Sequence, residues 1–129
     1  MFLTMAGLRA AIAASGVIAA SPVAAAQIEI DGNYGNASGC AFAAGGNDFD
    51  DGMFYLTPRE VSSYATGCSF LQALRTENGA FVVTVICSHE GEETQTLGLM
   101  RIQKAADGSD AYEVFDDDGD LWKKVDRCP

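Results

Sequence analysis

The sequence predicts an all-β fold, a small antiparallel β-sandwich or barrel of about six to eight short strands after an N-terminal signal peptide. Three observations predict it. Short apolar segments alternate with turn-forming residues along most of the chain. No stretch has the periodicity of a long amphipathic helix. The chain also contains four cysteines, an even number that predicts two disulfides in a small exported domain.

Residues 1–26 are expected to be a cleaved signal peptide. The start carries one positive charge, Arg9, and an uncharged, alanine-rich run follows it. Pro22 breaks that run, and small residues stand at Ala24 and Ala26. This order is typical of secretory signal peptides, so we expect a periplasmic or secreted product. An uncleaved anchor is the alternative, but the run is short and weakly apolar, and no stable membrane anchor is expected.

Residues 27–129 are then expected to form a single β-rich domain, because no internal repeat or linker divides them. The 8 Lys and Arg include Arg9, so the domain keeps 7 basic residues against 18 acidic ones, a net charge of −11. Nucleic-acid binding needs clustered Lys and Arg and is not expected. The negative charge serves either solubility alone or docking on a basic envelope or extracellular protein.

The first part of the domain is expected to contain short elements. In order, these are the opening segment QIEI, the turn-rich run DGNYGNASG, a short strand CAFAA, a loop GGNDFDDG and a strand MFYLT. The next segment, PREVSSY, is expected to form one helical turn. Thr57 would cap this turn, Pro58 would take its first position, and Glu60 would reach back to the cap.

Two strands at about 65–75 and 80–87 are expected to pair as a hairpin. If the chain reverses at Glu77-Asn78, residues whose numbers sum to 155 face each other, and Cys68 meets Cys87. The other predicted pairs are Phe70–Val85, Gln72–Val83, Leu74–Phe81, Ser69–Ile86, Leu71–Thr84 and Ala73–Val82. A turn centred on Asn78-Gly79 would offset the cysteines and is the alternative. The apolar run 81–86 is expected to be the central, most buried strand.

The hairpin register predicts a disulfide between Cys68 and Cys87, and elimination then pairs Cys40 with Cys128. Gaps of 28, 19 and 41 residues and a single histidine argue against a zinc site. The absence of C-x-x-C argues against a redox-active pair. On the chain-entropy model the short loop contributes about 3 kcal/mol and the long loop about 4.5 kcal/mol.

The last part of the domain is expected to add three strands, TQTLGLMRI, AYEVF and LWKKV. In the first of them, Leu97 and Leu99 should lie on one side and Met100 and Ile102 on the other. The last two strands are expected to form a second hairpin around Asp118-Gly119. Its register predicts the cross-strand pairs Glu113–Lys124 and Phe115–Trp122.

Catalytic signals are weak in this sequence. His89 stands next to Ser88 and Glu90, but sequence neighbours point apart, and no G-x-S-x-G elbow is present. We therefore expect no catalytic residue and no cofactor. Asn36 begins a glycosylation sequon, which matters only in a source that glycosylates. Aromatic residues in the first half fit core packing, with a ligand site as the alternative: Tyr34, Phe42, Phe49, Phe54, Tyr55 and Tyr64.

Acidic residues cluster in three expected loops, at 48–51, 90–93 and 116–120. Asp116, Asp118 and Asp120 are weak candidates for calcium binding, as is the 48–51 cluster. An EF-hand needs glycine at position 6 and glutamate at position 12. Counted from Asp116, glycine is fourth and the twelfth residue is Arg127, so the motif fails.

These features favour an exported, acidic, non-catalytic binding or accessory module of the cell envelope or periplasm. In export signal, size, acidity and disulfides the chain resembles periplasmic lysozyme inhibitors, small β proteins that dock on a basic enzyme, although their motif residues have no match here. The alternatives are a small hydrolase or lyase using loop carboxylates, and a calcium-stabilised structural domain.

Overall fold

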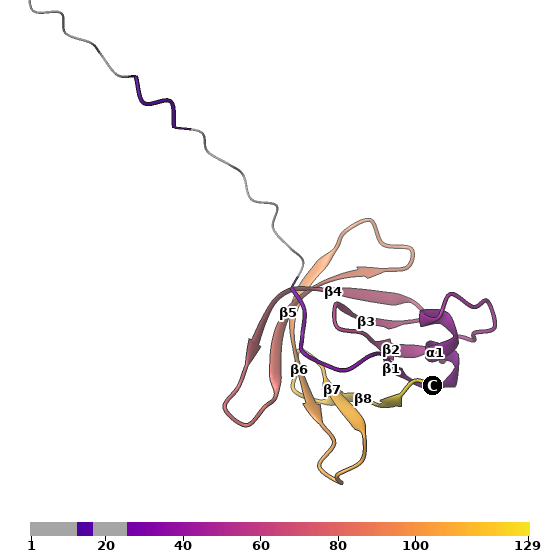
Figure 1. Ribbon diagram of the computed structural model, residues 1–129. Coiled ribbons are helices and arrows are strands. Elements are labelled where there is room, and N and C mark those ends of the chain that lie inside the picture. Colours follow the sequence, from indigo (N-terminus) through magenta and orange to yellow (C-terminus); the bar gives the residue numbers. More distant parts are fainter. Residues whose placement is uncertain (1–12, 17–25) are drawn as a thin grey trace, which may run out of the picture.

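The protein is a closed antiparallel barrel of eight strands in which each strand pairs with its neighbours in sequence and β1 pairs with β8 (Figure 1). This computed structural model describes residues 13–16 and 26–129, so the predicted signal peptide lies almost wholly outside the described residues. The strands are β1 (Tyr34–Gly35), β2 (Phe54–Leu56), β3 (Glu60–Ser63), β4 (Thr66–Arg75), β5 (Phe81–His89), β6 (Thr96–Lys104), β7 (Ala111–Phe115) and β8 (Leu121–Arg127). The predicted all-β class is confirmed, with the barrel as the architecture.

The core fills the inside of the barrel, and β5 shows how the sequence builds it. Alternate residues of this strand point inward, so Phe81, Val83, Val85 and Cys87 are buried. The residues between them face outward and are half-buried. Residues 81–86 were expected to be the central, most buried strand; each of them is buried or half-buried, but a closed barrel has no central strand.

The β4–β5 hairpin has the predicted register near the cysteines and a different one near its turn. Cys68 faces Cys87 and Phe70 faces Val85, as expected. Beyond a bulge at Leu71, however, the pairing shifts by one residue. The observed pairs there are Gln72–Thr84, Ala73–Val83, Leu74–Val82 and Arg75–Phe81, which correct the four pairs predicted for this region. The turn has three residues instead of two, and its third residue is Gly79 at φ +84°.

The β7–β8 hairpin repeats this arrangement. Glu113 faces Lys124 as predicted, but Phe115 faces Leu121 and not Trp122. A three-residue turn ending at Gly119, with φ +82°, again replaces the predicted two-residue turn. A bulge at Trp122 accommodates the extra turn residue, so Trp122 has no pairing partner on β7. Its ring packs edge-on against Phe54, with 4.8 Å between ring centroids.

The segment predicted as a strand CAFAA is part of the helix α1 (Ala37–Ala43). Asn36 caps this helix, because its Oδ1 accepts hydrogen bonds from the backbone N–H of Gly39 at 2.7 Å and of Phe54 at 3.1 Å. Its Nδ2 donates to the carbonyl oxygen of Gly52 at 2.6 Å. One polar side chain therefore ties the helix to the start of β2, which local strand propensity could not indicate.

The segment predicted as a helical turn is β3, which pairs with β2 and β4. Thr57 does act as a local cap, since its Oγ1 accepts from the backbone N–H groups of Arg59 and Glu60 at 3.2 Å each. The chain then continues as a strand because Val61 is completely buried in the barrel. The opening segment QIEI forms no strand, but Ile28 is buried and its N–H donates to the carbonyl of Pro58 at 2.8 Å.

Both predicted disulfides are confirmed. Cys68 and Cys87 join β4 to β5, with an Sγ–Sγ distance of 2.07 Å. Cys40 and Cys128 join α1 to the end of the chain at 2.05 Å, and Figure 1 shows the C-terminus beside α1. Two such bonds indicate an oxidising compartment outside the cytoplasm. None of the helices in the described residues has the length and apolar character needed to cross a membrane.

Candidate functional site

Seven acidic residues lie in two loops that contain no Lys or Arg. The β5–β6 loop and the β7–β8 loop connect strand ends at the same end of the barrel. We call these two loops, with their seven acids, the acidic mouth: Glu90, Glu92, Glu93, Asp116, Asp117, Asp118 and Asp120. In the part of the chain that the structure describes, none of the seven takes part in an ion pair.

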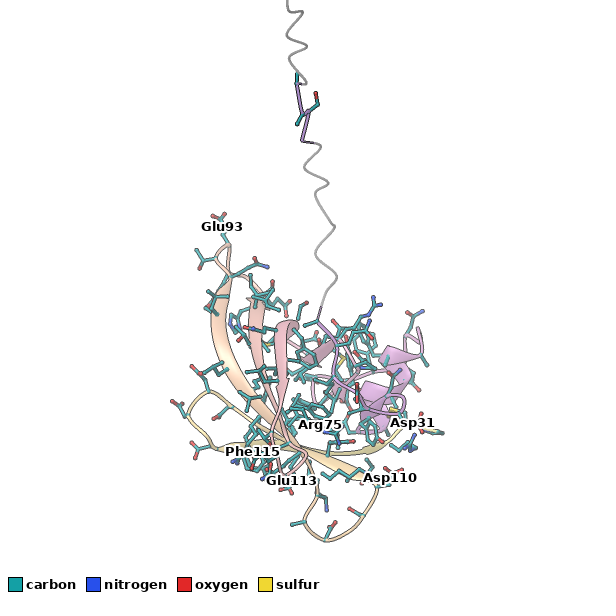
Figure 2. The ribbon with its side chains drawn as sticks, turned by 60° about the vertical axis from the view of Figure 1, so that its left-hand side comes forward. Asp31, Arg75, Glu93, Asp110, Glu113 and Phe115 are labelled. Carbon is teal, nitrogen blue, oxygen red and sulfur yellow. A yellow bond between two sulfur atoms is a disulfide. The ribbon has the colours of Figure 1, made fainter. Side chains whose placement is uncertain are left out.

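The four ion pairs of the described residues involve acids outside the mouth. They are Arg75–Glu29 at 3.5 Å, Lys124–Asp107 at 2.5 Å, Arg127–Asp31 at 3.4 Å and Arg127–Asp110 at 2.5 Å. Figure 2 shows Asp31 and Asp110 toward one side of the molecule, and Glu93 and Phe115 toward the other. The ion pairs of the described residues thus lie away from the acidic mouth.

A recess of about 400 Å³ opens to solvent at the acidic mouth. Its apolar lining comes from the inward-facing residues Val85, Met100 and Trp122, from the Cys68–Cys87 disulfide, and from Leu97 and Leu99 of β6. The recess exists because Gly98, which faces Val85 across the β5–β6 ladder, has no side chain to fill it. A Cβ atom at Gly98 would lie 3.7 Å from Val85 Cγ2 and 3.8 Å from the Asp117 carboxyl carbon.

One rim of the recess is a chain of hydrogen bonds through His89. The Nδ1 atom of His89 lies 3.0 Å from Thr66 Oγ1, and its Nε2 atom lies 3.0 Å from Thr96 Oγ1. His89 therefore links β4, β5 and β6. The adjacent Ser88 accepts a hydrogen bond from Gln95 Nε2 at 2.9 Å and makes none with the imidazole. The three sequence neighbours Ser88, His89 and Glu90 do not converge as a catalytic triad would.

The opposite rim consists of Asp116 and Asp117. Asp117 Oδ1 accepts a hydrogen bond from the backbone N–H of Leu99 at 3.0 Å. Asp116 Oδ1 accepts from the N–H groups of Asp118 and Asp120, at 3.0 Å each. Each carboxylate is thus held through one oxygen, while its Oδ2 atom accepts no hydrogen bond from the described residues. The rim is therefore both charged and fixed in orientation.

The calcium candidates Asp116, Asp118 and Asp120 share one tight turn, in which the Asp116 carboxylate binds backbone N–H groups. Across the described ranges, 13–16 and 26–129, no three His, Cys, Asp or Glu residues are grouped so that they could hold a metal ion. Calcium binding at this turn therefore stays a prediction, and the geometry adds no support to it.

Two leucines that line the recess are largely exposed. As predicted, Leu97 and Leu99 share the outer face of β6, where they are 72% and 52% exposed, while Met100 and Ile102 are buried. The pairing of β6 with β7 begins only at Arg101, so residues 96–100 have a strand neighbour on one side alone. An apolar strip whose outer backbone edge has no strand partner, with the Leu99 N–H bound by Asp117, thus borders the acidic mouth.

The aromatic residues of the first half lie in the core or near α1, except for Tyr64, which is half exposed. Tyr34 and Phe54 are core residues. Phe42 packs against Phe49 and Tyr55, with 4.8 Å and 5.7 Å between ring centroids, on the outside of the barrel near α1. A wider hollow of about 950 Å³ lies between α1 and the C-terminus, over the Cys40–Cys128 disulfide. The charged side chains lining this hollow include Arg127, which is already engaged by Asp31 and Asp110.

Comparison of the chain with protein-family models, curated proteins and solved structures gave no match. The site therefore rests on the geometry of this chain alone. Sequence reasoning identified the acidic loops but did not join two of them into one mouth. The antiparallel order of the strands could have provided that signal. In an up-and-down barrel every second loop lies at the same end, so the β5–β6 and β7–β8 loops share an end. The role of Gly98 carried no sequence signal.

Proposed function

We propose that the protein is an exported, non-catalytic binding module of the periplasm or extracellular space that docks on a basic protein through the acidic mouth. The observation that carries this proposal is the segregation of charge. Asp116 and Asp117 line an open, apolar-lined recess, five further acids without ion pairs lie in the same two loops, and the four ion pairs of the described residues lie elsewhere. A one-sided field of this kind accelerates and orients encounters with partners of opposite charge.

The mouth also has the general composition of a protein-binding surface. Leu97 and Leu99 supply exposed apolar area in the recess, and Asp116 and Asp117 add negative charge at its rim. Acid–base catalysis by two carboxylates requires them to face each other across a cleft. Asp116 and Asp117, which line the recess, are instead adjacent on one turn and are held by backbone N–H groups. This arrangement favours binding over hydrolysis.

The proposal is tested by measuring the binding of basic proteins to the immobilised protein at several salt concentrations. Lysozyme and cytochrome c are suitable basic probes, with an acidic protein as the negative control. We expect binding that weakens steeply with salt, because exposed charges are screened over about 10 Å at 0.1 M ionic strength. The variant Glu92→Gln/Glu93→Gln should bind several-fold more weakly than the wild type.

The matched control removes two charges away from the mouth, in Glu77→Gln/Asp126→Asn. Glu77 belongs to the β4–β5 turn and Asp126 to the far end of β8. This variant has the same net charge as the mouth variant, so only the position of the lost charges differs. Equal weakening by the two variants, or no binding of either basic probe, would contradict the proposed function.

A further inference from the structure

We propose that the recess at the acidic mouth is the docking point for one protruding Lys or Arg side chain of the partner protein. Its aliphatic stem would lie on the apolar lining of the recess, and its cation would meet the carboxylates of Asp116 and Asp117. This inference rests on the proposed function and adds the chemistry of the contact. It also assigns a role to Gly98, whose missing side chain leaves the recess open.

The lining of the recess fits the stem of such a side chain. Val85, Met100 and Trp122 present carbon atoms, and the Cys68–Cys87 disulfide is uncharged and has no hydrogen-bond donor. The three or four methylene groups of Arg or Lys pack on apolar surface while the charged end stays at its edge. A purely aliphatic side chain would fill the same space but would leave the rim carboxylates without a partner.

The rim fits the charged end. The Oδ1 atoms of Asp116 and Asp117 are occupied by backbone N–H groups at 3.0 Å, which fixes both carboxylates. Their Oδ2 atoms remain available as acceptors for an ammonium or guanidinium group. Hydrogen bonds between such ions are roughly twice as strong as neutral ones. Because the carboxylates are already oriented, a partner would spend little conformational entropy in meeting them.

The occupant is a protein side chain rather than a small molecule, because part of the apolar lining of the recess is widely exposed on the outside of the barrel. Leu97 and Leu99 line the recess from β6 and are 72% and 52% exposed, an apolar area that a larger partner surface would cover. A second copy of this chain is an unsuitable occupant, since the chain carries a net charge of −10 and two copies repel each other. The charge of the mouth therefore selects a basic partner over self-association.

The experiment uses a phage-displayed library of random peptides, selected on the wild-type protein. We expect enriched peptides that share a Lys or Arg next to an apolar residue. One such peptide is then synthesised with its key Lys replaced by norleucine, which keeps the stem and removes the cation. We expect a loss of about tenfold or more in affinity, as for an anchor residue of an interface. Enrichment of peptides that lack a cation would overturn the proposal.

On the protein side, Gly98→Leu fills the recess and keeps all seven carboxylates. We expect it to weaken the peptide about tenfold or more, whereas Leu74→Ser, which changes an exposed leucine of β4 outside the recess, should bind as the wild type does. Asp117→Asn provides a second test that leaves an acceptor for the Leu99 N–H. Unchanged affinity in both Gly98→Leu and Asp117→Asn would overturn the proposal.

The two proposals fail in different ways. Gly98→Leu does not alter the charge of the mouth, whereas Glu92→Gln/Glu93→Gln does not alter the recess. If the charge variant loses lysozyme or cytochrome c binding while Gly98→Leu retains it, the proposed function stands and the side-chain pocket is wrong. Thermal unfolding of each variant shows whether it is folded, and the norleucine peptide tests the cation without any change in the protein.

Discussion

Gly39 is the residue at which the smallest change should have the largest effect on stability. It lies in α1, and a Cβ atom there would be 1.9 Å from the carbonyl oxygen of Phe54. Both groups are backbone-fixed, so neither can move aside cheaply. We expect Gly39→Ala to lower the free energy of unfolding by about 2–4 kcal/mol or to prevent folding, measured by urea denaturation.

Gly98→Ala is the matched control for this prediction. Its nearest neighbour would be Val85 Cγ2 at 3.7 Å, which is an ordinary contact. The stability of Gly98→Ala should therefore stay within about 0.5 kcal/mol of the wild type, or rise slightly through the less flexible unfolded chain. If Gly39→Ala were as stable as Gly98→Ala, the packing of α1 on β2 described here would be wrong.

Asn36 is the second residue with a large predicted effect, because it makes three hydrogen bonds at once. We expect Asn36→Ala to lower the free energy of unfolding by about 2–3 kcal/mol, since it removes the helix cap and the contact to Gly52. Asn36→Asp keeps the accepting oxygen and should lose less. Chemical denaturation of both variants tests this order, and equal losses would contradict it.

Individual elements show where sequence reasoning succeeded and where it did not. The register of the β4–β5 hairpin predicted the Cys68–Cys87 disulfide, and elimination then predicted Cys40–Cys128. The turns were predicted with two residues and have three, each ending in a glycine with positive φ. A three-residue turn alone would move every side chain to the wrong face. The bulges at Leu71 and Trp122 restore the inward pattern, and no local signal placed them.

The elements near α1 were the least predictable. CAFAA has the composition of a short strand, yet its helical state depends on Asn36 and on the disulfide from Cys40 to Cys128. PREVSSY has the residues of a helix start, but pairing on both sides of β3 outweighs the cap at Thr57. In both segments, contacts with residues distant in the sequence determine the conformation. Such contacts cannot be predicted from the local sequence.

The β6–β7 turn gives the protein a predictable sensitivity to acid. The hydrogen bond from the Lys124 ammonium group holds the pKa of Asp107 well below its usual range. The hydrogen bond from Arg127 lowers the pKa of Asp110 in the same way. A carboxyl group whose pKa is lower in the folded state contributes stability above its unfolded pKa of about 4. That contribution is lost as the pH falls through the folded value.

We therefore expect the melting temperature of the wild type to fall between about pH 5 and pH 2 more steeply than that of Asp107→Asn/Asp110→Asn. The control Glu77→Gln, which changes an acid outside the ion pairs, should retain the slope of the wild type. Calorimetry across this pH range measures the difference. Parallel pH profiles for the wild type and the double variant would show that these pairs do not contribute.

At the scale of the whole molecule, stability should depend most on the disulfide that closes the larger loop. Cys40 and Cys128 are 88 residues apart, whereas Cys68 and Cys87 are 19 apart. On the chain-entropy model these bonds contribute about 4.5 and about 3 kcal/mol. Replacing the first pair by alanine should therefore cost more in urea denaturation than replacing the second. A larger loss from the β4–β5 pair would contradict this order.

The whole-molecule arrangement also explains why the candidate site was only partly predictable. Acidic residues are common at turns simply because they are well hydrated there. The sequence therefore did not distinguish Asp117, which borders the recess, from Asp107, which forms an ion pair with Lys124. The distinction appears only when the strands are placed in order around the barrel. Asp117 then lies over Gly98, and Asp107 lies beside Lys124 at the opposite end.

The central claim is that the acidic mouth is the surface through which this protein binds basic partners. It is tested most directly by following backbone amide signals in NMR spectra while lysozyme or cytochrome c is added. The account predicts that shifts concentrate in residues 88–100 and 115–122 and disappear at high salt. Shifts centred on α1 and the C-terminus, or spread evenly over the barrel, would contradict it.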